Sequence, residues 1–260
     1  MTYLDRPLSN AYSRLEAWLL IGGVWVGLMA IPFIQGGVGL GWDSLNHHIY
    51  LGWTAEHERF GVDWRAAASQ VYQWPYLYWP VYAMAVHGFS GLMAGMVLST
   101  LNATTAWPIW MVVKSCIPGT SRADGMARAM AMLMAYASGV VLSQLDTTLN
   151  DLLAAQPFLM SVALTISGRH VGAFPHLKGL DQACLPGLLA GVSVACKFSN
   201  GPLALVLPVL WMIAAAGSLP RRFMVALIGG ISVLIGFGLA YGPWGLTLWH
   251  YFGNPFYSFI

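Results

Sequence analysis

The sequence predicts an all-α integral membrane protein, a polytopic helical bundle of about seven transmembrane segments. Of its 260 residues, 57% are hydrophobic and only 8% are charged, and the mean hydropathy is +0.62. An ordinary soluble domain carries about 25% charged residues, so a soluble fold could not cover its surface with this composition. Several long apolar runs define the individual segments.

Seven apolar segments follow one another along the chain: residues 17–34, 81–113, 127–145, 152–166, 184–196, 202–216 and 223–241. A transmembrane helix needs about 20 residues, within a range of about 17 to 25. The fourth, fifth and sixth segments are short by this measure. Either they lie tilted inside the bundle, or the fifth and sixth form a re-entrant pair around Lys197. Residues 1–260 would form a single transmembrane domain.

Lysine and arginine predict the orientation, because short cytoplasmic loops carry an excess of both. With the N-terminus in the cytoplasm, nine of these residues fall on the cytoplasmic side: Arg6, Arg14, Lys114, Arg122, Arg128, Arg169, Lys178, Arg221 and Arg222. Only Arg59, Arg65 and Lys197 fall on the other side. Residues 1–16 are polar and do not resemble a signal peptide. We therefore expect a multi-pass protein of the bacterial inner (plasma) membrane, with residues 36–80 forming a loop outside the cytoplasm.

This first loop concentrates ionisable side chains in a chain that has few of them: Asp43, Glu56, Glu58, Asp63, His47, His48 and His57. Residues 44–60 show helical spacing, with Leu45, His48, Ile49 and Trp53 on one face. That pattern predicts an amphipathic helix on the membrane surface. Asp43 precedes it and either caps the helix or carries chemistry. The two adjacent histidines are either interfacial anchors or part of a site.

Two further polar groups fall on the same side of the predicted membrane. Residues 143–151 connect the third and fourth segments, where Asp146 or Thr147 would cap the next helix. Asn150 and Asp151 lie at its start, and an ionisable residue at membrane depth is a functional candidate by default. Lys197 follows the fifth segment. It is either a lysine that snorkels to the interface or a cation that binds a lipid phosphate.

The motif Trp42-Asp43-Ser-Leu-Asn46-His47-His48-Ile-Tyr50 follows the first segment. After it come, in order, Thr147-Thr148-Leu-Asn150-Asp151, the stretch 191–200 around Lys197, and Gly253-Asn254-Pro255-Phe256-Tyr257. Motifs of this kind in this order resemble the GT-C superfamily of membrane glycosyltransferases, and more closely a large bacterial group within it. GT-C enzymes generally have more than seven spans. The resemblance therefore implies that the chain is the N-terminal part of a longer protein, truncated at its C-terminus.

The resemblance implies a glycosyltransferase that moves a sugar from a polyprenyl-phosphate donor to a lipid or glycan acceptor at the extracytoplasmic face. Asp43 would be the catalytic carboxylate that deprotonates or orients the acceptor hydroxyl, and Lys197 would hold the donor phosphate. The implied substrate-binding residues are His47, His48, Asp63, Asn150, Asp151, Lys197 and Asn254. His48 and Asp151 would contact sugar hydroxyls or a divalent cation, Mg²⁺ or Mn²⁺. Many GT-C enzymes carry paired acids in the first loop. Here Asp43 is followed by Ser-Leu-Asn, so a second acid would come from Asp63 or another loop, or be absent.

Two other classes of function stay open. Short segments broken around Lys197, with Asp151 at membrane depth, would also suit a transporter or flippase. The abrupt end at Ile260 would suit a non-catalytic membrane subunit or a fragment. Membrane lipids are expected partners, whereas nucleic acid is not, because the net charge of +2 is small and spread over loops. Cys116, Cys184 and Cys196 lack the spacing of a zinc site or a disulfide framework.

Overall fold

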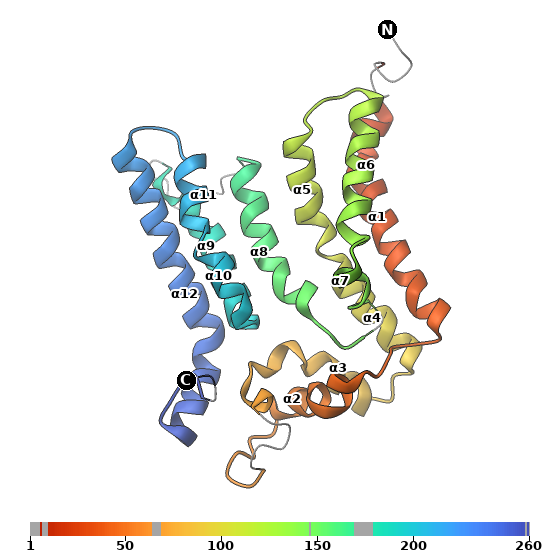
Figure 1. The fold of residues 1–260 in the computed structure, drawn as a ribbon, viewed down its shortest axis with the longest axis vertical. Coiled ribbons are helices and arrows are strands. Elements are labelled where there is room, and N and C mark those ends of the chain that lie inside the picture. The colour runs from red at the N-terminus through yellow and green to blue at the C-terminus, as the bar shows by residue number, and fades with distance from the viewer. Residues whose placement is uncertain are drawn as a thin grey trace.

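The computed structural model describes residues 6, 10–63, 69–145, 147–168, 179–257 and 259. Four residues that enter the charge and capping arguments lie outside this part of the chain: Arg65, Asp146, Arg169 and Lys178. The described part is built from helices and their connections, as the composition predicts (Figure 1).

The helical elements have the following bounds in chain order: α1 (Asn10–Gln35), η2 (Ser44–His48), α2 (Ile49–Thr54), η3 (Gln70–Tyr72), η4 (Pro75–Leu77), α3 (Trp79–Val86), α4 (Gly91–Ala103), α5 (Ala106–Cys116), α6 (Arg122–Tyr136), α7 (Gly139–Leu142), α8 (Asp151–Ile166), η6 (Leu180–Ala183), α9 (Cys184–Cys196), η7 (Phe198–Asn200), α10 (Gly201–Ala204), α11 (Leu207–Ala214) and α12 (Leu219–Phe252). Here η2 is a π-helical turn and the other η elements are 3-10 turns.

Three helices are long and apolar enough to cross a membrane: Leu15–Gln35 in α1, Gly91–Cys116 in α4 and α5, and Leu219–Phe252, which is α12. Three other apolar helices are shorter, namely Asp151–Ile166, Leu180–Cys196 and Phe198–Ala214. Large apolar side chains on the long helices are exposed, among them Trp18, Leu234 and Leu239. Surfaces of this kind suit contact with lipid. The three candidate spans mark a helical membrane protein, and the number of seven spans stays a prediction.

The predicted apolar segments all contain helix, but the second, third and sixth are broken, the sixth between α10 and α11. Segment 81–113 begins in α3, and the chain then turns through Gly88, at φ 72°, before Ser90 caps α4. Segment 127–145 is divided between α6 and α7, and the side chain of Ser138 caps α7. A glycine at positive φ and a serine cap both mark helix ends. The apolar content of a segment alone does not reveal these helix ends.

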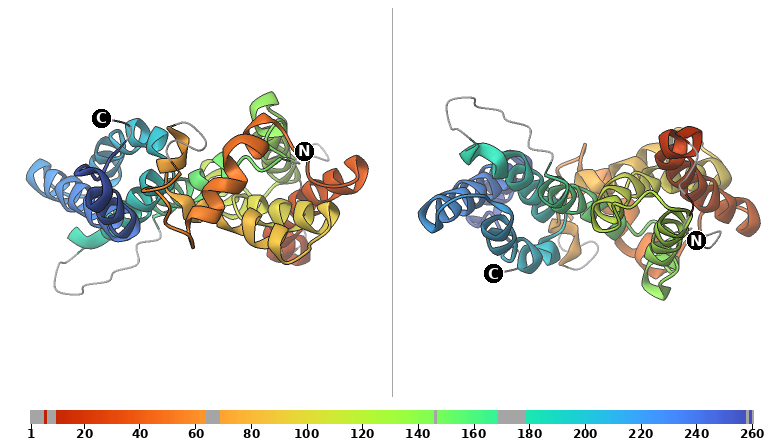
Figure 2. Two further views of the ribbon diagram at one scale, coloured as in Figure 1. Left: turned by 90° about the horizontal axis from the view of Figure 1, so that it is seen from below. Right: turned by 90° about the horizontal axis from the view of Figure 1, so that it is seen from above.

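The long helices form two groups that lie side by side (Figures 1 and 2). α1, α4, α5 and α6 pack together in one group, and α8, α9, α11 and α12 in the other. α5 packs against α8 where the groups meet. Each group has its own buried apolar cluster, around Leu28 and Met132 in the first and around Trp211 and Val225 in the second.

The helices α9 and α12 approach each other closely because glycines line their contact. A Cβ atom at Gly187 would overlap the backbone oxygen of Gly229, and one at Gly191 would overlap the backbone oxygen of Val233. Small residues that let two backbones approach are typical of helix pairs in membranes. This contact fixes the position of α9, which ends just before Lys197.

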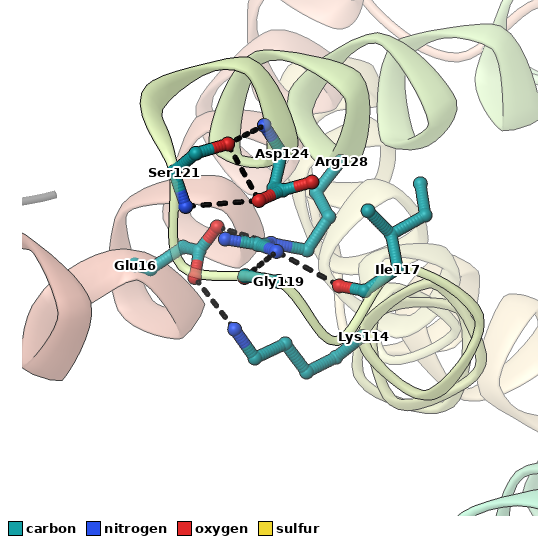
Figure 3. Close-up of polar contacts among 7 residues, drawn as sticks. All are labelled: Glu16, Lys114, Ile117, Gly119, Ser121, Asp124 and Arg128. Atoms are coloured by element: carbon teal, nitrogen blue, oxygen red, sulfur yellow. Dashed lines mark hydrogen bonds and ion pairs between the residues drawn. The ribbon is translucent and has the colours of Figure 1, made fainter. Parts of the chain in front are cut away.

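A buried ion network ties α1, α5 and α6 together near one end of the molecule (Figure 3). Glu16 and Arg128 are 1% and 0% exposed, and Nε of Arg128 donates to Oε1 of Glu16 at 2.6 Å. Nη1 of Arg128 donates to the carbonyls of Ile117 and Gly119, at 2.8 Å each. Nζ of Lys114 lies 3.4 Å from Oε2 of Glu16. Lys114 and Arg128, which the sequence presents only as cytoplasmic charges, are therefore parts of a structural network.

The polar segments singled out from the sequence lie at the opposite end. There α2, α3 and their connecting turns cross the ends of the long helices, at the bottom of Figure 1. The start of α8 and the end of α12 lie at the same end. This arrangement brings the first loop close to segments that are far from it in the sequence.

Candidate functional site

The helix after the first span is shorter than predicted and buries different residues. The spacing predicts a helix over residues 44–60, whereas the structure has the π turn Ser44–His48 followed by Ile49–Thr54. Leu45, predicted on the same apolar face as His48, is 68% exposed, and Leu51 is fully buried. A π turn holds more residues than an α-helical turn. It therefore rotates the side chains away from the 3.6-residue pattern used for the prediction.

Asp43 stands at the N-cap position of the π turn but does not cap it. Its side chain makes no capping hydrogen bond and is 45% exposed, with Oδ1 3.9 Å from Nδ1 of His47. The capping alternative is therefore wrong. The carboxylate is accessible and stands beside an imidazole, an arrangement suited to accepting a proton from a substrate.

Thr148 connects the first loop to the segment before α8. Its Oγ1 lies 2.6 Å from Oγ of Ser44 and 2.6 Å from Nδ1 of His48, and all three side chains are buried. These contacts span 104 and 100 positions of sequence. Thr148 stands in one of the motifs noted above, yet nothing in its local sequence distinguishes it from a threonine in an ordinary turn.

The two adjacent histidines are buried in the protein and do not act as interfacial anchors. The ring of His48 lies 4.6 Å from that of Tyr78 and 4.5 Å from that of His47. Burial, followed by the neighbouring His47, lowers the pKa of His48 from 6.5 to about 4. Burial also lowers the pKa of His47, against the opposing effect of Asp43. Both imidazoles are therefore mostly neutral at pH 7, and Nδ1 of His47 has no hydrogen-bond partner among the described residues.

Asp151 and Lys197 form an ion pair between two helices of the second group. Asp151 is the first residue of α8, as predicted, and Lys197 follows α9 in an extended conformation. Their side chains are 37% and 34% exposed, so the pair is accessible to solvent or a ligand. The pair gives Lys197 a partner within the protein, which the snorkelling alternative does not provide.

The first turn of α8 obtains its hydrogen bonds differently from the prediction. Oγ1 of Thr147 accepts from the backbone two residues later and does not cap the helix. Instead, Oε1 of Gln144 accepts from the backbone N–H of Leu152 at 3.3 Å. Asp146, the other predicted cap, lies outside the described residues. Asn150 occupies the cap position without a side-chain cap bond, and its buried Nδ2 has no partner in the described part of the chain.

Asp43 and Lys197 lie within electrostatic range of the same imidazole. Burial lowers the pKa of His48 most strongly; beyond that, Asp43 raises this pKa and Lys197 lowers it. Burial also lowers the pKa of Lys197, and the Asp43 carboxylate opposes that effect. The structure therefore gathers Asp43, Lys197 and Asp151 from three segments. Asp151, which pairs with Lys197, is an acidic residue from outside the first loop.

A cavity of about 170 Å³ opens beside Lys197. Its lining comes from the first loop, the end of α9 with the connection after it, and the C-terminal segment: Gln73, Trp74, Ala195, Cys196, Lys197, Phe198, Ser199 and Phe259. Nε1 of Trp74 donates to the carbonyl of Ala240 at 3.2 Å, which fixes the indole against α12. An ammonium, an amide and aromatic rings around one cavity suit a ligand that has both an anionic and an apolar part.

Two predicted binding residues, Asp63 and Asn254, make structural contacts. Oδ2 of Asp63 lies 3.1 Å from Nε of Arg59 and accepts from the hydroxyl of Tyr50 at 3.2 Å. Oδ1 of Asn254 accepts from the backbone N–H of Phe256 at 2.9 Å, closing the turn after α12. These contacts shape the loops around the site.

No group of three or more His, Cys, Asp or Glu side chains that could hold a metal ion occurs among the described residues. Nδ1 of His48 contacts Thr148, and a carboxylate oxygen of Asp151 contacts Lys197. Mg²⁺ is usually held by one or two carboxylates together with substrate phosphates. A divalent cation here would therefore depend on Asp43 or Asp151 and on a bound substrate.

Comparisons with protein-family models, curated proteins and solved structures find no match to this chain.

Proposed function

We propose that the chain is, or forms part of, a GT-C-like membrane glycosyltransferase. It would transfer a sugar from a polyprenyl-phosphate donor to a hydroxyl acceptor at the face that carries the first loop. One observation carries the proposal: an accessible carboxylate, Asp43, lies within electrostatic range of Lys197, which is itself paired with Asp151 and lines a cavity.

The donor phosphate would bind at Lys197. An ammonium is a compact positive charge that pairs well with phosphate oxygens, and Asp151 holds it at the cavity before the donor arrives. Trp74 and Phe198 supply apolar and aromatic surface in the same cavity for the sugar or the first part of the prenyl chain. The end of α9 lies beside α12, a candidate span, which suits a donor anchored in lipid.

The acceptor hydroxyl would lose its proton to Asp43. As its oxygen bonds to the anomeric carbon, the bond from that carbon to the phosphate oxygen breaks. The electron pair leaves with the polyprenyl phosphate, whose added negative charge Lys197 stabilises. A placed general base contributes typically about 10² to 10⁴ in rate.

The test uses the full chain in lipid nanodiscs with a panel of polyprenyl-phosphate-linked hexoses and pentoses. Mass spectrometry would follow both release of polyprenyl phosphate and formation of the glycosylated product. We expect Asp43→Asn to lower the transfer rate at least about 100-fold. We expect Lys197→Met to weaken donor binding, which would be measured without acceptor so that no transfer occurs. The matched control is Glu58→Gln, which removes an exposed carboxylate from the same loop.

Transfer by Asp43→Asn at the wild-type rate would remove Asp43 from the proposed role. Unchanged donor binding by Lys197→Met would do the same for Lys197. In proteoliposomes, movement of the lipid-linked sugar across the bilayer without any product would favour a flippase.

A further inference from the structure

A second polar cavity lies far from the proposed glycosyl-transfer site. Its volume is about 120 Å³, and its lining is Trp110, Met111, Lys114, Ser115 and Ser167. These residues belong to the last turns of α5 and the residue that follows α8. A single water needs only about 10 to 15 Å³ of such space, so the cavity has room for a larger polar group.

The residues that line the cavity carry hydrogen-bond donors that the protein does not fully use. Nε1 of Trp110 is buried and has no hydrogen-bond partner among the described residues. An indole N–H can only donate, so it requires an acceptor. Lys114 has three donors, and its one described ion pair is the 3.4 Å contact with Glu16. The hydroxyl of Ser167 makes only a long bond, 3.4 Å, to the carbonyl of Leu164.

The charge around the cavity favours an anion. None of the five lining residues is acidic, and the nearby carboxylate of Glu16 is engaged by Arg128 at 2.6 Å. Lys114 is 33% exposed, so its charge can reach a ligand in the cavity. A phosphate group has several acceptor oxygens around one centre. It can therefore accept from side chains on two helices at once.

The position of the cavity suits a lipid headgroup. Lys114 lies two residues before the end of the candidate span Gly91–Cys116, the depth at which lipid phosphates are found. The ring of Trp107 lies 5.9 Å from that of Trp110 and 6.1 Å from that of Trp18. Tryptophans grouped in this way are typical of a membrane interface.

From these observations we infer that the cavity at the ends of α5 and α8 binds a phosphate group, with Lys114 supplying the charge and Trp110 an N–H donor. The phosphate belongs either to an anionic phospholipid or to a soluble phosphate compound. This inference does not depend on the proposed transferase activity.

The test compares the full chain purified from nanodiscs of phosphatidylcholine alone and of phosphatidylcholine with phosphatidylglycerol. Native mass spectrometry would count retained phosphatidylglycerol, and a parallel titration with inorganic phosphate would follow the thermal midpoint. Trp110→Phe removes the N–H and keeps a ring, and Lys114→Gln removes the charge. Trp107→Phe is the matched control, because Trp107 belongs to the same group of rings but does not line the cavity.

We expect wild type and Trp107→Phe to retain phosphatidylglycerol, and the two cavity variants to bind it about tenfold or more weakly, since a hydrogen bond to a charged group is lost. A shift with inorganic phosphate that disappears in the same variants, without lipid retention, would assign the site to a soluble phosphate. Equal retention by all four proteins, or absence of any retained or bound phosphate, would overturn the inference.

Discussion

The Lys197 ammonium and the Asp151 carboxylate form an ion pair across 46 positions of sequence, between the end of α9 and the start of α8. The pair is partly exposed, with about a third of each side chain accessible. We therefore expect its contribution to stability to lie between that of an exposed ion pair and that of a buried one. Exposed pairs stabilise a protein by about 0–1 kcal/mol, and breaking a buried pair costs about 3–5 kcal/mol.

A double-mutant cycle measures what this pair contributes. We expect Asp151→Asn and Lys197→Met each to lower the free energy of unfolding by about 1–2 kcal/mol, above the range for exposed pairs and below the range for buried pairs. The double variant should lose less than the sum of the single changes, because each single change leaves one partner unpaired. Denaturant unfolding in detergent measures the four proteins. Strict additivity would show that the two residues do not interact in the folded protein.

Substitutions in the buried network of Glu16 and Arg128, at the other end of the molecule, should lower the free energy of unfolding much more. In Glu16→Gln, Arg128 keeps its bonds to the carbonyls of Ile117 and Gly119 but loses its carboxylate. An uncompensated buried charge costs about 3–5 kcal/mol, so we expect a loss of unfolding free energy in this range. Lys114→Gln serves as the comparison with a smaller expected loss, because Lys114 is partly exposed and lies farther from Glu16 than Arg128 does. It should cost about 1 kcal/mol or less. Equal losses from the two changes would contradict a dominant role for the buried pair.

The sequence predicted the class of the fold and the position of several site residues. Helical membrane segments could be predicted from apolar content, because every residue of a segment contributes to it. The positions of Asp151 at the start of a helix and of Lys197 just after one follow from where apolar runs begin and end. These are local properties, and the structure reproduces them.

The contacts that join distant segments could not be predicted in the same way. Thr148 meets Ser44 and His48 across about a hundred positions, and Glu16 meets Arg128 across 112. Partners of this kind are selected by the packing of whole helices. The π turn after Asp43 is a second case, because it changes which side chains face inward without changing the composition of the segment.

The burial of His48 predicts a loss of stability in acid. Its pKa is lowered from 6.5 to about 4 in the folded protein. Between these values the unfolded chain binds the proton and the folded chain does not, so falling pH favours unfolding. Stability should be complete above about pH 6.5 and should decrease toward pH 4, by at most about 3 kcal/mol for this group. His47 shifts in the same direction.

Thermal midpoints at pH 7.5 and pH 5 test this prediction. The difference between them should become smaller in His48→Gln, which removes the titrating ring. It should persist in His57→Gln, which removes an exposed histidine of the same loop. A pH dependence that His48→Gln leaves unchanged would assign the effect to other groups.

The contact between α9 and α12 predicts that one methyl group can disturb both stability and the site. In Gly191→Ala the new Cβ would overlap the backbone oxygen of Val233, and a backbone atom has little freedom to move aside. The two helices would have to separate, so we expect a loss of about 1–3 kcal/mol, the usual cost of overpacking. Gly230→Ala is the control, because a Cβ there meets nothing within 4 Å. Alanine is the better helix former by about 1 kcal/mol, so this change should be neutral or stabilising. Since α9 ends just before Lys197, Gly191→Ala should also weaken donor binding at Lys197. Normal binding with reduced stability would show that Lys197 is positioned by Asp151 and not by the α9–α12 contact.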